Sequence, residues 1–247
     1  MKEFIYSRNA VYETLRAKRR QVFGLQVAEG AQEKGRLTEI LRLAEERRLP
    51  VRHVPRPLLD KIHPAHQGVV LEAGGYPYVT LADLLDLAAQ RGEAPFLLLL
   101  DTLNDPQNFG ALLRTAEAVG VHGVLLPLAR TVEVTPAVVN ASSGASEHLL
   151  IARMNLSQAL DELRQADIWI VGLDQGAGSR APSEVRWTGG LALVVGSEGE
   201  GIRPLVKSKC DFLVRLPMQG KVESLNAAAA GSVALYLAYL ARRQPTP

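Results

Sequence analysis

The stretch LALVVGSEGEG, residues 191–201, joins a run of apolar residues to a turn with glycines at positions 196, 199 and 201. A nearly pure apolar run is typical of a strand buried on both faces of a parallel sheet. The glycine spacing differs from the G-x-G-x-x-G fingerprint of dinucleotide-binding folds. It indicates a turn that admits a ligand close to the backbone, because a plain flexible loop would not explain Glu198 among glycines after a buried strand.

Two more polar, glycine-containing blocks follow apolar runs in the same part of the chain. They are DPQNFG, residues 105–110, with Arg114 shortly after it, and LPMQG, residues 216–220, followed by SLN at 224–226. Because the carboxyl ends of parallel strands meet at one sheet edge, the three blocks are predicted to converge on a single ligand site. Another turn, GLDQGAG at 172–178, is a weaker candidate that a surface loop would explain equally well.

The first block combines a helix start with several polar groups. Pro106 is rigid, Asn108 is expected to cap the helix, and Arg114 falls in its second turn. A capped helix with Arg114 paired to Glu117 would account for part of this pattern. Asp105, Asn108 and Arg114 together are more polar groups than a cap needs, which favours a functional role.

The last block precedes an expected C-terminal helix over residues 225–242, which Ser224 or Asn226 would cap. Residues 227–230 are all alanine, which allows close packing, and a tight helix interface alone would explain them. The loop before the helix offers backbone amides, small polar groups and the adaptable side chain of Met218. These features suit the adenosine end of a cofactor.

The spacing of apolar residues and breaks predicts two α/β domains. Residues 1–73 form a small module, residues 74–94 a linker with a helix at 81–91, and residues 95–247 a second domain around a parallel sheet. In the module we expect strands at 4–6, 22–27, 51–53 and 68–72, and helices at 9–18, 32–48 and 57–62. In the second domain we expect strands at 96–100, 123–126, 149–152, 168–173, 191–195 and 212–216, and helices at 109–119, 156–166 and 225–242.

Composition restricts the class of protein. The 247 residues contain no apolar run of the roughly 20 residues that a membrane span needs. The start of the chain, MKEF, lacks the apolar core of a signal peptide. The single cysteine, Cys210, excludes an internal disulfide framework and a cysteine-rich metal site. These features predict a cytoplasmic protein.

Charge is distributed unevenly along the chain. Residues 1–75 carry 14 Lys/Arg against 9 Asp/Glu, whereas the remainder carries 14 against 17. Basic clusters lie at 16–20 and 47–56. This segregation indicates a polyanionic partner such as RNA, although a solvated surface of helix-favouring charges would give the same composition.

The three blocks resemble the three motifs of the SpoU (TrmH-like) RNA ribose 2′-O-methyltransferases, within the SPOUT superfamily. DPxNxG with Arg114, GSEGxG at 196–201 and LPMxG with SLN at 216–226 stand in the family's order and spacing. The resemblance covers residues 95–247. It implies S-adenosylmethionine-dependent methylation of a ribose 2′-hydroxyl in RNA, by a homodimer that uses no metal.

The N-terminal module resembles the L30e-like RNA-binding domain that precedes the catalytic domain in several members. HQGVV at 66–70 and SSGA at 142–145 are similar to stretches of the bacterial enzymes that methylate a guanosine of 23S rRNA. YSRN at 6–9 departs from the glycine-containing start that is common there. The implied fold is therefore an α/β, parallel-sheet SPOUT catalytic domain with a C-terminal trefoil knot, preceded by a small L30e-like α/β domain.

The resemblance leaves alternatives for the function. A tRNA ribose 2′-O-methyltransferase and a non-catalytic RNA-binding protein are both open, although intact Asn108, Arg114 and Glu198 argue against lost catalysis. A nucleotide-dependent oxidoreductase is disfavoured, because no G-x-G-x-x-G follows the first strand of the second domain.

The resemblance also implies roles for individual residues. Arg114 is the central catalytic residue and, because an arginine stays protonated, we expect it to stabilise the developing alkoxide and grip a neighbouring phosphate. The other residues implied in catalysis are Asn108, Glu198, Ser224 and Asn226. The cofactor-binding residues implied are Leu173, Gly196, Glu198, Gly199, Leu216, Met218, Ser224, Leu225 and Asn226. RNA contacts are expected from Arg8, Arg16, Arg19, Arg20 and Arg114. The last helix, with Val233, Leu235, Leu237 and Leu240, is expected in the dimer interface or in the core.

Overall fold

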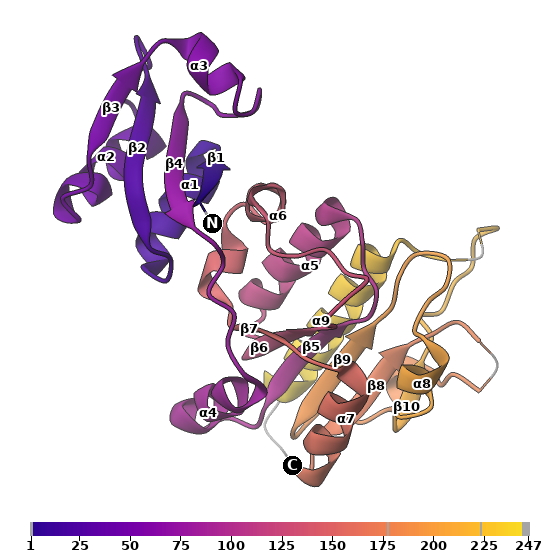
Figure 1. Ribbon diagram of the computed structural model, residues 1–247. Helices are drawn as coiled ribbons and strands as arrows, with labels where there is room; N and C mark the ends of the chain where they lie inside the picture. The colour runs from indigo at the N-terminus through magenta and orange to yellow at the C-terminus, as the bar shows by residue number, and fades with distance from the viewer. Residues whose placement is uncertain (1, 177, 223, 244–247) are drawn as a thin grey trace. The chain divides into compact units, whose positions relative to one another are not determined.

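The chain folds into two units whose boundaries do not follow the order of the sequence (Figure 1). The computed structural model describes residues 2–176, 178–222 and 224–243. The first unit contains residues 1–77 together with 133–148, and the second contains 78–132 together with 149–247. The segment 133–148 lies between two strands of the second unit in the sequence, yet it packs with the first. The chain therefore passes between the units at three places.

A four-stranded mixed sheet forms the first unit, in the order β1-β4-β2-β3. Strand β4 runs antiparallel to β1 and β2, whereas β2 and β3 are parallel. The strands are β1 Lys2–Tyr6, β2 Val22–Ala28, β3 Val51–Val54 and β4 Val69–Gly74. The helices are α1 Arg8–Ala17, α2 Arg36–Glu46, α3 Arg56–Asp60, α6 Pro136–Ala141 and a 3-10 helix at Ala145–His148. The last two come from the segment 133–148 and contact β1 and α1, so this segment is part of the unit's packing.

The second unit is built on a six-stranded, all-parallel sheet in the order β10-β8-β9-β5-β6-β7. The strands are β5 Phe96–Leu100, β6 Gly123–Leu126, β7 Ile151–Arg153, β8 Trp169–Leu173, β9 Leu191–Val195 and β10 Phe212–Val214. The helices are α4 Leu81–Arg91, α5 Pro106–Ala118, α7 Leu156–Gln165, α8 Pro204–Lys207 and α9 Ala227–Arg243, with a 3-10 turn at Pro182–Glu184. The predicted parallel sheet is confirmed, and its central strands β5 and β9 are buried along their whole length.

Helices cover both faces of this sheet (Figure 1). Apolar residues of α4, α7 and α8 share one core cluster with one face of the strands, including Leu84, Leu160 and Val194. Helix α9 packs on the opposite face. A Cβ on its Gly231 would lie 2.5 Å from a methyl of Leu112 in α5 and 3.2 Å from one of Val195 in β9. The glycine and the neighbouring alanines therefore bring α9 close to α5, as their small size predicts.

The helix caps differ in part from the sequence prediction. Helix α5 begins at Pro106, and the Asp105 carboxylate accepts hydrogen bonds from the backbone N–H groups of Gln107 and Asn108, both at 3.1 Å. The expected cap at Asn108 is therefore wrong, because Asp105 directly before a proline at the first helical position satisfies the free N–H groups. This leaves the Asn108 side chain available for other partners. At α9 the prediction holds, since Asn226 Oδ1 accepts from the Ala229 N–H at 3.1 Å.

Candidate active site

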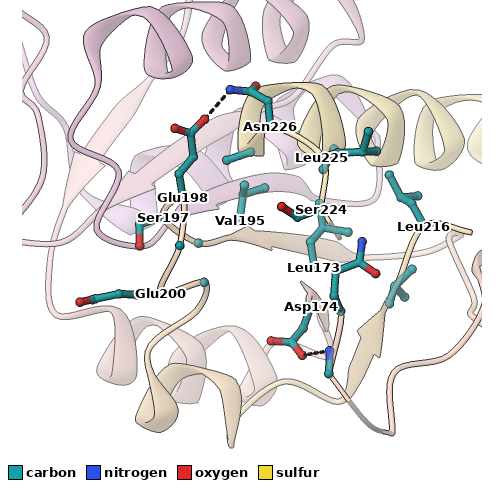
Figure 2. Close-up of a pocket in the computed structure, with 18 of the residues that line it drawn as sticks. Leu173, Asp174, Val195, Ser197, Glu198, Glu200, Leu216, Ser224, Leu225 and Asn226 are labelled. Carbon is teal, nitrogen blue, oxygen red and sulfur yellow. Dashed lines mark hydrogen bonds between the residues drawn. The ribbon is translucent and has the colours of Figure 1, made fainter. Parts of the chain in front are cut away.

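A cavity of about 610 Å³ opens at the carboxyl ends of β8, β9 and β10 (Figure 2). Its walls combine apolar side chains with glycine backbone and a few charged groups. It is lined by Leu173, Asp174, Gln175, Gly176, Val195, Gly196, Ser197, Glu198, Gly199, Glu200, Gly201, Lys207, Val214, Leu216, Ser224, Leu225, Asn226, Ala227 and Ala230. This set includes every residue that the sequence suggested for the cofactor except Met218. The Met218 sulfur instead accepts a hydrogen bond from Gln175 Nε2 at 3.9 Å.

The glycine turn after β9 is a closed loop with almost no space at its base. Ser197 and Gly201 exchange backbone hydrogen bonds, each 3.1 Å long. A Cβ on Gly196 would lie 2.1 Å from the carbonyl carbon of Gly201, so only glycine fits there. Gly199 and Gly201 have positive φ angles of 90° and 70°, a region that side chains with a Cβ rarely adopt. The three glycines of the GSEGEG block therefore determine the shape of the loop that carries Glu198.

A polar cluster joins the three sequence blocks. The Asn108 side-chain amide donates to Glu198 Oε1 at 2.8 Å, and the Asn226 amide donates to Asn108 Oδ1 at 2.9 Å. Asn226 also donates to Glu198 Oε1, a contact drawn in Figure 2. The three side chains come from the start of α5, the glycine loop and the start of α9. The predicted convergence of the blocks at one sheet edge is thus present, with an exposed carboxylate held by two amides.

Arg114 lies on the exposed side of α5, beside this cluster. It lines a second hollow of about 550 Å³ between α5 and α9. The other lining residues are Gln107, Asn108, Ala111, Thr115, Asn226, Ala228, Ala229 and Ser232. Asn226 faces both hollows and Asn108 joins them through Glu198, so the polar cluster stands between the cavity and the groove that holds Arg114. A group that enters the groove would meet the guanidinium on one side and the cavity on the other.

The site residues predicted from the sequence omit three charged groups of the cavity, Asp174, Glu200 and Lys207. Asp174 Oδ1 accepts from the Gly176 N–H at 2.7 Å and pairs with Lys207 Nζ at 2.8 Å. Asp174 lies in the GLDQGAG turn, which the sequence indicates as a weaker candidate site. No sequence pattern indicated Lys207. Nearby, burial together with the Asp211 and Asp101 charges raises the pKa of the Cys210 thiol to about 12, which keeps that thiol neutral.

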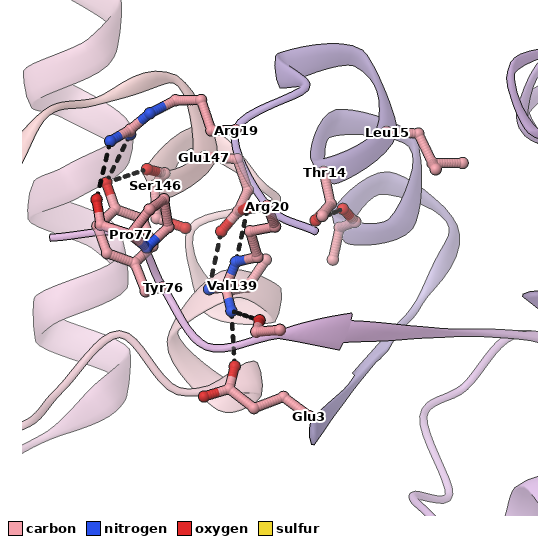
Figure 3. A network of polar contacts seen from close by, with 12 residues as sticks. Glu3, Thr14, Leu15, Arg19, Arg20, Tyr76, Pro77, Val139, Ser146 and Glu147 are labelled. Carbon is pink, nitrogen blue, oxygen red and sulfur yellow. Dashed lines mark hydrogen bonds and ion pairs between the residues drawn. The ribbon is translucent and has the colours of Figure 1, made fainter. Parts of the chain in front are cut away.

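One of the expected RNA contacts is buried inside the first unit (Figure 3). Arg20 Nε and Nη2 donate to the two carboxylate oxygens of Glu147 at 2.9 and 3.1 Å. Its Nη1 donates to Glu3 at 2.6 Å and to the Gly74 carbonyl at 3.0 Å. With a side chain that is 0% exposed, Arg20 does not reach a phosphate outside the protein. We therefore remove it from the RNA-binding set. A cluster of basic residues in the sequence does not distinguish a surface arginine from a buried structural one.

The remaining arginines of this set differ in their surroundings. Of Arg8, Arg16 and Arg19, only Arg16 is exposed, and it makes a 3.4 Å contact with Glu13. Arg8 bonds through its backbone N–H and its Nε to Gln67. Arg19 donates to the Tyr76 hydroxyl at 2.8 Å and to the Pro77 carbonyl at 3.2 Å. Arg16 is thus the best placed of the three for a solvent-side partner.

The part of the chain that the structure describes offers neither a candidate metal centre nor a candidate membrane span. Its His, Cys, Asp and Glu side chains form no group of three or more that could hold a metal ion. Its helices include none that is both long and apolar enough to cross a bilayer.

Comparison with protein families identifies the class to which this fold and this site belong. The model of the SpoU rRNA methylase family matches residues 95–236, and that of the substrate-binding domain of RNA 2′-O ribose methyltransferases matches residues 4–79. The chain belongs to the SpoU (TrmH-like) family of RNA ribose 2′-O-methyltransferases, as its three sequence blocks indicated.

Individual relatives agree with this family. The chain is 43% identical over 245 residues to the putative TrmH family tRNA/rRNA methyltransferase YacO of Bacillus subtilis, covering 97% of this chain and 96% of that protein. It is 39% identical over 236 residues to an uncharacterized tRNA/rRNA methyltransferase of Mycolicibacterium smegmatis, covering 94% of this chain and 74% of the relative.

Solved structures share the fold over nearly the whole chain. The SpoU methyltransferase AviRb from Streptomyces viridochromogenes, in complex with AdoMet, superposes with a TM-score of 0.81 at 24% identity, covering 97% of this chain and 89% of that one. The putative RNA methyltransferase of the TrmH family from Porphyromonas gingivalis gives a TM-score of 0.73 at 25% identity, with coverage of 98% of this chain and 90% of that one.

Proposed function

We propose that this chain transfers a methyl group from S-adenosylmethionine to the ribose 2′-hydroxyl of a guanosine in 23S rRNA. Family membership supports the reaction type, and the HQGVV and SSGA stretches support the rRNA guanosine as the target. The observation that carries the proposal is the cluster of Asn108, Glu198 and Asn226, which joins all three family motifs between a cavity and the groove of Arg114.

The cavity residues fit the cofactor in size and chemistry. Its volume of about 610 Å³ lies within the roughly 300–1,000 Å³ typical of small-molecule sites. Leu173, Leu216 and Leu225 would pack against the adenosine, and the glycine loop would supply backbone hydrogen bonds to it. Glu198 and Glu200 add negative charge, which favours a sulfonium cation over a neutral thioether. When bound, the cofactor supplies an electrophilic methyl group with a neutral leaving group.

The chain's own task is then to position the hydroxyl and to manage its proton. Arg114 remains protonated and would stabilise the alkoxide as it develops, while its fork of N–H groups holds a neighbouring RNA phosphate. That phosphate or a water would accept the proton. Asn108 and Asn226, fixed by Glu198, would orient the ribose, and Ser224 would help from the cavity wall.

Two further features belong to this proposal. The polypeptide around the cavity, residues 191–226, is proposed to form the trefoil knot of the SPOUT fold. The enzyme is proposed to act as a homodimer through α9, on which Val233, Tyr236 and Leu240 are about half exposed whereas Leu235 is buried in the core.

Transfer of tritium from labelled S-adenosylmethionine to separated rRNA and tRNA, with the modified nucleotide mapped, tests the proposal. We expect label on one 2′-O-methylguanosine of 23S rRNA. Label only on tRNA would replace the proposed substrate with the family's other class, and no label on either RNA would contradict catalysis. Arg114→Lys keeps the charge and removes the fork, so near-normal turnover in that variant would exclude the proposed role of the guanidinium.

The first unit is proposed to bind the surrounding RNA through phosphates. Arg16→Glu should weaken RNA binding and leave the affinity for S-adenosylmethionine unchanged, because Arg16 lies outside the cavity. Binding should also weaken as salt rises. Glu46→Lys on the neighbouring α2 adds positive charge at an exposed site and is the control of opposite sign. It should not weaken RNA binding.

A further inference from the structure

Asp101, at the end of β5, makes polar contacts on both sides of the glycine loop. Its backbone N–H donates to the Val195 carbonyl at 2.8 Å, directly before the loop begins. Its carboxylate accepts from the Arg203 backbone N–H at 2.8 Å and from Arg203 Nε at 2.7 Å, directly after the loop ends. The second guanidinium contact, from Nη2, is 2.6 Å. One residue therefore anchors the entry and the exit of residues 196–202.

The Asp101 side chain is fully buried, whereas Arg203 is 38% exposed. A buried carboxylate is costly unless its oxygens are hydrogen-bonded. Among the residues that the structure describes, the donors to the Asp101 oxygens all belong to Arg203. The Asp101 carboxylate is thus hydrogen-bonded by Arg203, the residue directly after the loop. The next residue, Thr102, has a φ of 59°, which is unfavourable for a β-branched side chain. Strain of this kind persists where the surroundings fix the backbone, and it often lies at functional sites.

Arg203 connects Asp101 to the cavity through the segments on both sides of it in the sequence. Toward the N-terminus, the closed loop from Gly196 to Gly201 carries Glu198, the acceptor for both amides of the polar cluster. Toward the C-terminus, Arg203 precedes α8, and its carbonyl accepts from the N–H of Lys207, which lines the cavity and pairs with Asp174. Asp101 itself is not among the residues that line the cavity.

We infer that Asp101 is a positioning residue for the cofactor, acting through Arg203 to hold the loop that carries Glu198 in its binding geometry. The inference rests on the proposed placement of S-adenosylmethionine in this cavity. The sequence by itself indicates no role for either residue, because Asp101 follows an apolar strand and Arg203 lies in a turn before a proline. Only the fold brings them together, across 102 positions of sequence.

Calorimetric titration of S-adenosylmethionine into the full chain, together with steady-state kinetics, tests this inference. Asp101→Asn keeps the backbone N–H and the side-chain volume but turns an amide NH₂ toward the donors of Arg203. We expect the Kd and KM for S-adenosylmethionine to rise by about tenfold or more, with the KM for RNA unchanged. Asp161→Asn removes an ion pair with Lys209 in the same unit, away from the cavity, and should leave both constants unchanged.

A rescue variant separates positioning from general destabilisation. In Asp101→Asn combined with Arg203→Gln, the two amides can hydrogen-bond to each other, so we expect part of the lost affinity to return. Thermal melts of all variants locate a temperature at which each is folded, and the affinities are compared there. Asp101→Asn binding within about twofold of the wild type at that temperature would overturn the inference, as would an equal loss in Asp161→Asn.

A cavity variant distinguishes failure of this inference from failure of the proposed site. Leu225→Arg fills the cavity with a long charged side chain and should abolish cofactor binding. If Leu225→Arg binds S-adenosylmethionine normally, the cofactor lies elsewhere and both proposals fall. If Leu225→Arg loses binding while Asp101→Asn keeps it, only the role of Asp101 is refuted.

Discussion

Two polar networks of this chain contain similar groups in opposite surroundings. In the first unit, Arg20 is buried and bonded to Glu147 and Glu3 (Figure 3). In the second unit, Asn108 and Asn226 bond to Glu198 at an exposed sheet edge, and Figure 2 shows the contact with Asn226. Loss of a partner in the buried network leaves a charge that water does not reach, whereas water replaces a lost partner at the exposed edge. The first network therefore fixes packing, and the second leaves its polar groups available to a ligand.

The buried network also explains why residues 133–148 belong to the first unit. Glu147 comes from this segment, and its neighbour Ser146 accepts a hydrogen bond through its carbonyl from the Tyr76 hydroxyl at 3.2 Å. Burial raises the pKa of Glu147, while the Arg20 charge acts in the opposite direction. These contacts hold a segment from the middle of the sequence against a module formed by the first 77 residues.

The largest expected effect follows from breaking the buried network. Glu147→Ala leaves the buried guanidinium of Arg20 with Glu3 as its only carboxylate among its described partners, and should lower the free energy of unfolding by about 3–5 kcal/mol. Urea denaturation followed by circular dichroism measures this. Glu46→Ala removes an exposed pair with Arg42 and should cost at most about 1 kcal/mol. Similar costs for the two variants would contradict the contrast drawn between buried and exposed pairs.

A smaller loss of stability, with a large loss of binding, is expected at the glycine loop. Gly196→Ala places a Cβ against the Gly201 backbone, so the loop must shift. We expect a cost of about 1–3 kcal/mol in unfolding free energy, and S-adenosylmethionine binding too weak for calorimetric detection. Gly220→Ala is the matched control, because no atom of the described residues lies within 4 Å of the added Cβ. Undiminished binding in Gly196→Ala would mean that the loop does not form the cofactor site.

At the exposed network, activity should change far more than stability. Glu198→Gln keeps the shape of the side chain but places an NH₂ group where two amides now donate. We expect a change in unfolding free energy within about 0.5 kcal/mol and a fall in methyl transfer of about 10²-fold. Single-turnover transfer to RNA measures the second quantity. A stability loss as large as that of Glu147→Ala would show that the exposed network, like the buried one, stabilises the fold.

The smallest expected effect concerns pH and His122, a buried side chain of the second unit. Burial lowers the pKa of His122, even though Glu93 opposes the shift. Its Nδ1 accepts from the Phe96 N–H at 3.0 Å, which requires an unprotonated nitrogen. In the unfolded chain His122 binds a proton below its ordinary pKa near 6.5, whereas in the folded chain burial opposes protonation. The contribution of neutral His122 to folding stability is therefore present above pH 6.5 and is lost as pH falls.

His122→Asn retains an acceptor near Nδ1 and does not titrate. The stability advantage of the wild type over this variant, about 1 kcal/mol at pH 7.5, should therefore shrink toward pH 5.5 in thermal melts. An advantage that grows on acidification would refute the assigned protonation state.

Local sequence signals were sufficient for most elements of the fold. Strands at 96–100, 123–126 and 191–195 and the helix at 81–91 have the predicted bounds, because apolar runs and a capping residue act over a few positions. The site was predictable in part, since the glycine blocks follow strands of one parallel sheet. Lys207 and the cap at Asp105 were missed, because each depends on partners or backbone geometry that spacing does not reveal. Asp174 lies in the GLDQGAG turn, which the sequence indicated only as a weaker candidate.

The sequence by itself determined the family, the parallel sheet and the three blocks that meet at its edge. The tertiary structure alone decided which charges are structural. The sequence indicated Arg20 as an RNA contact and no role for Asp101, yet both are buried against partners more than 100 positions away. The physical reason is that desolvation depends on everything packed around a side chain, whereas helix and strand signals depend on its immediate neighbours.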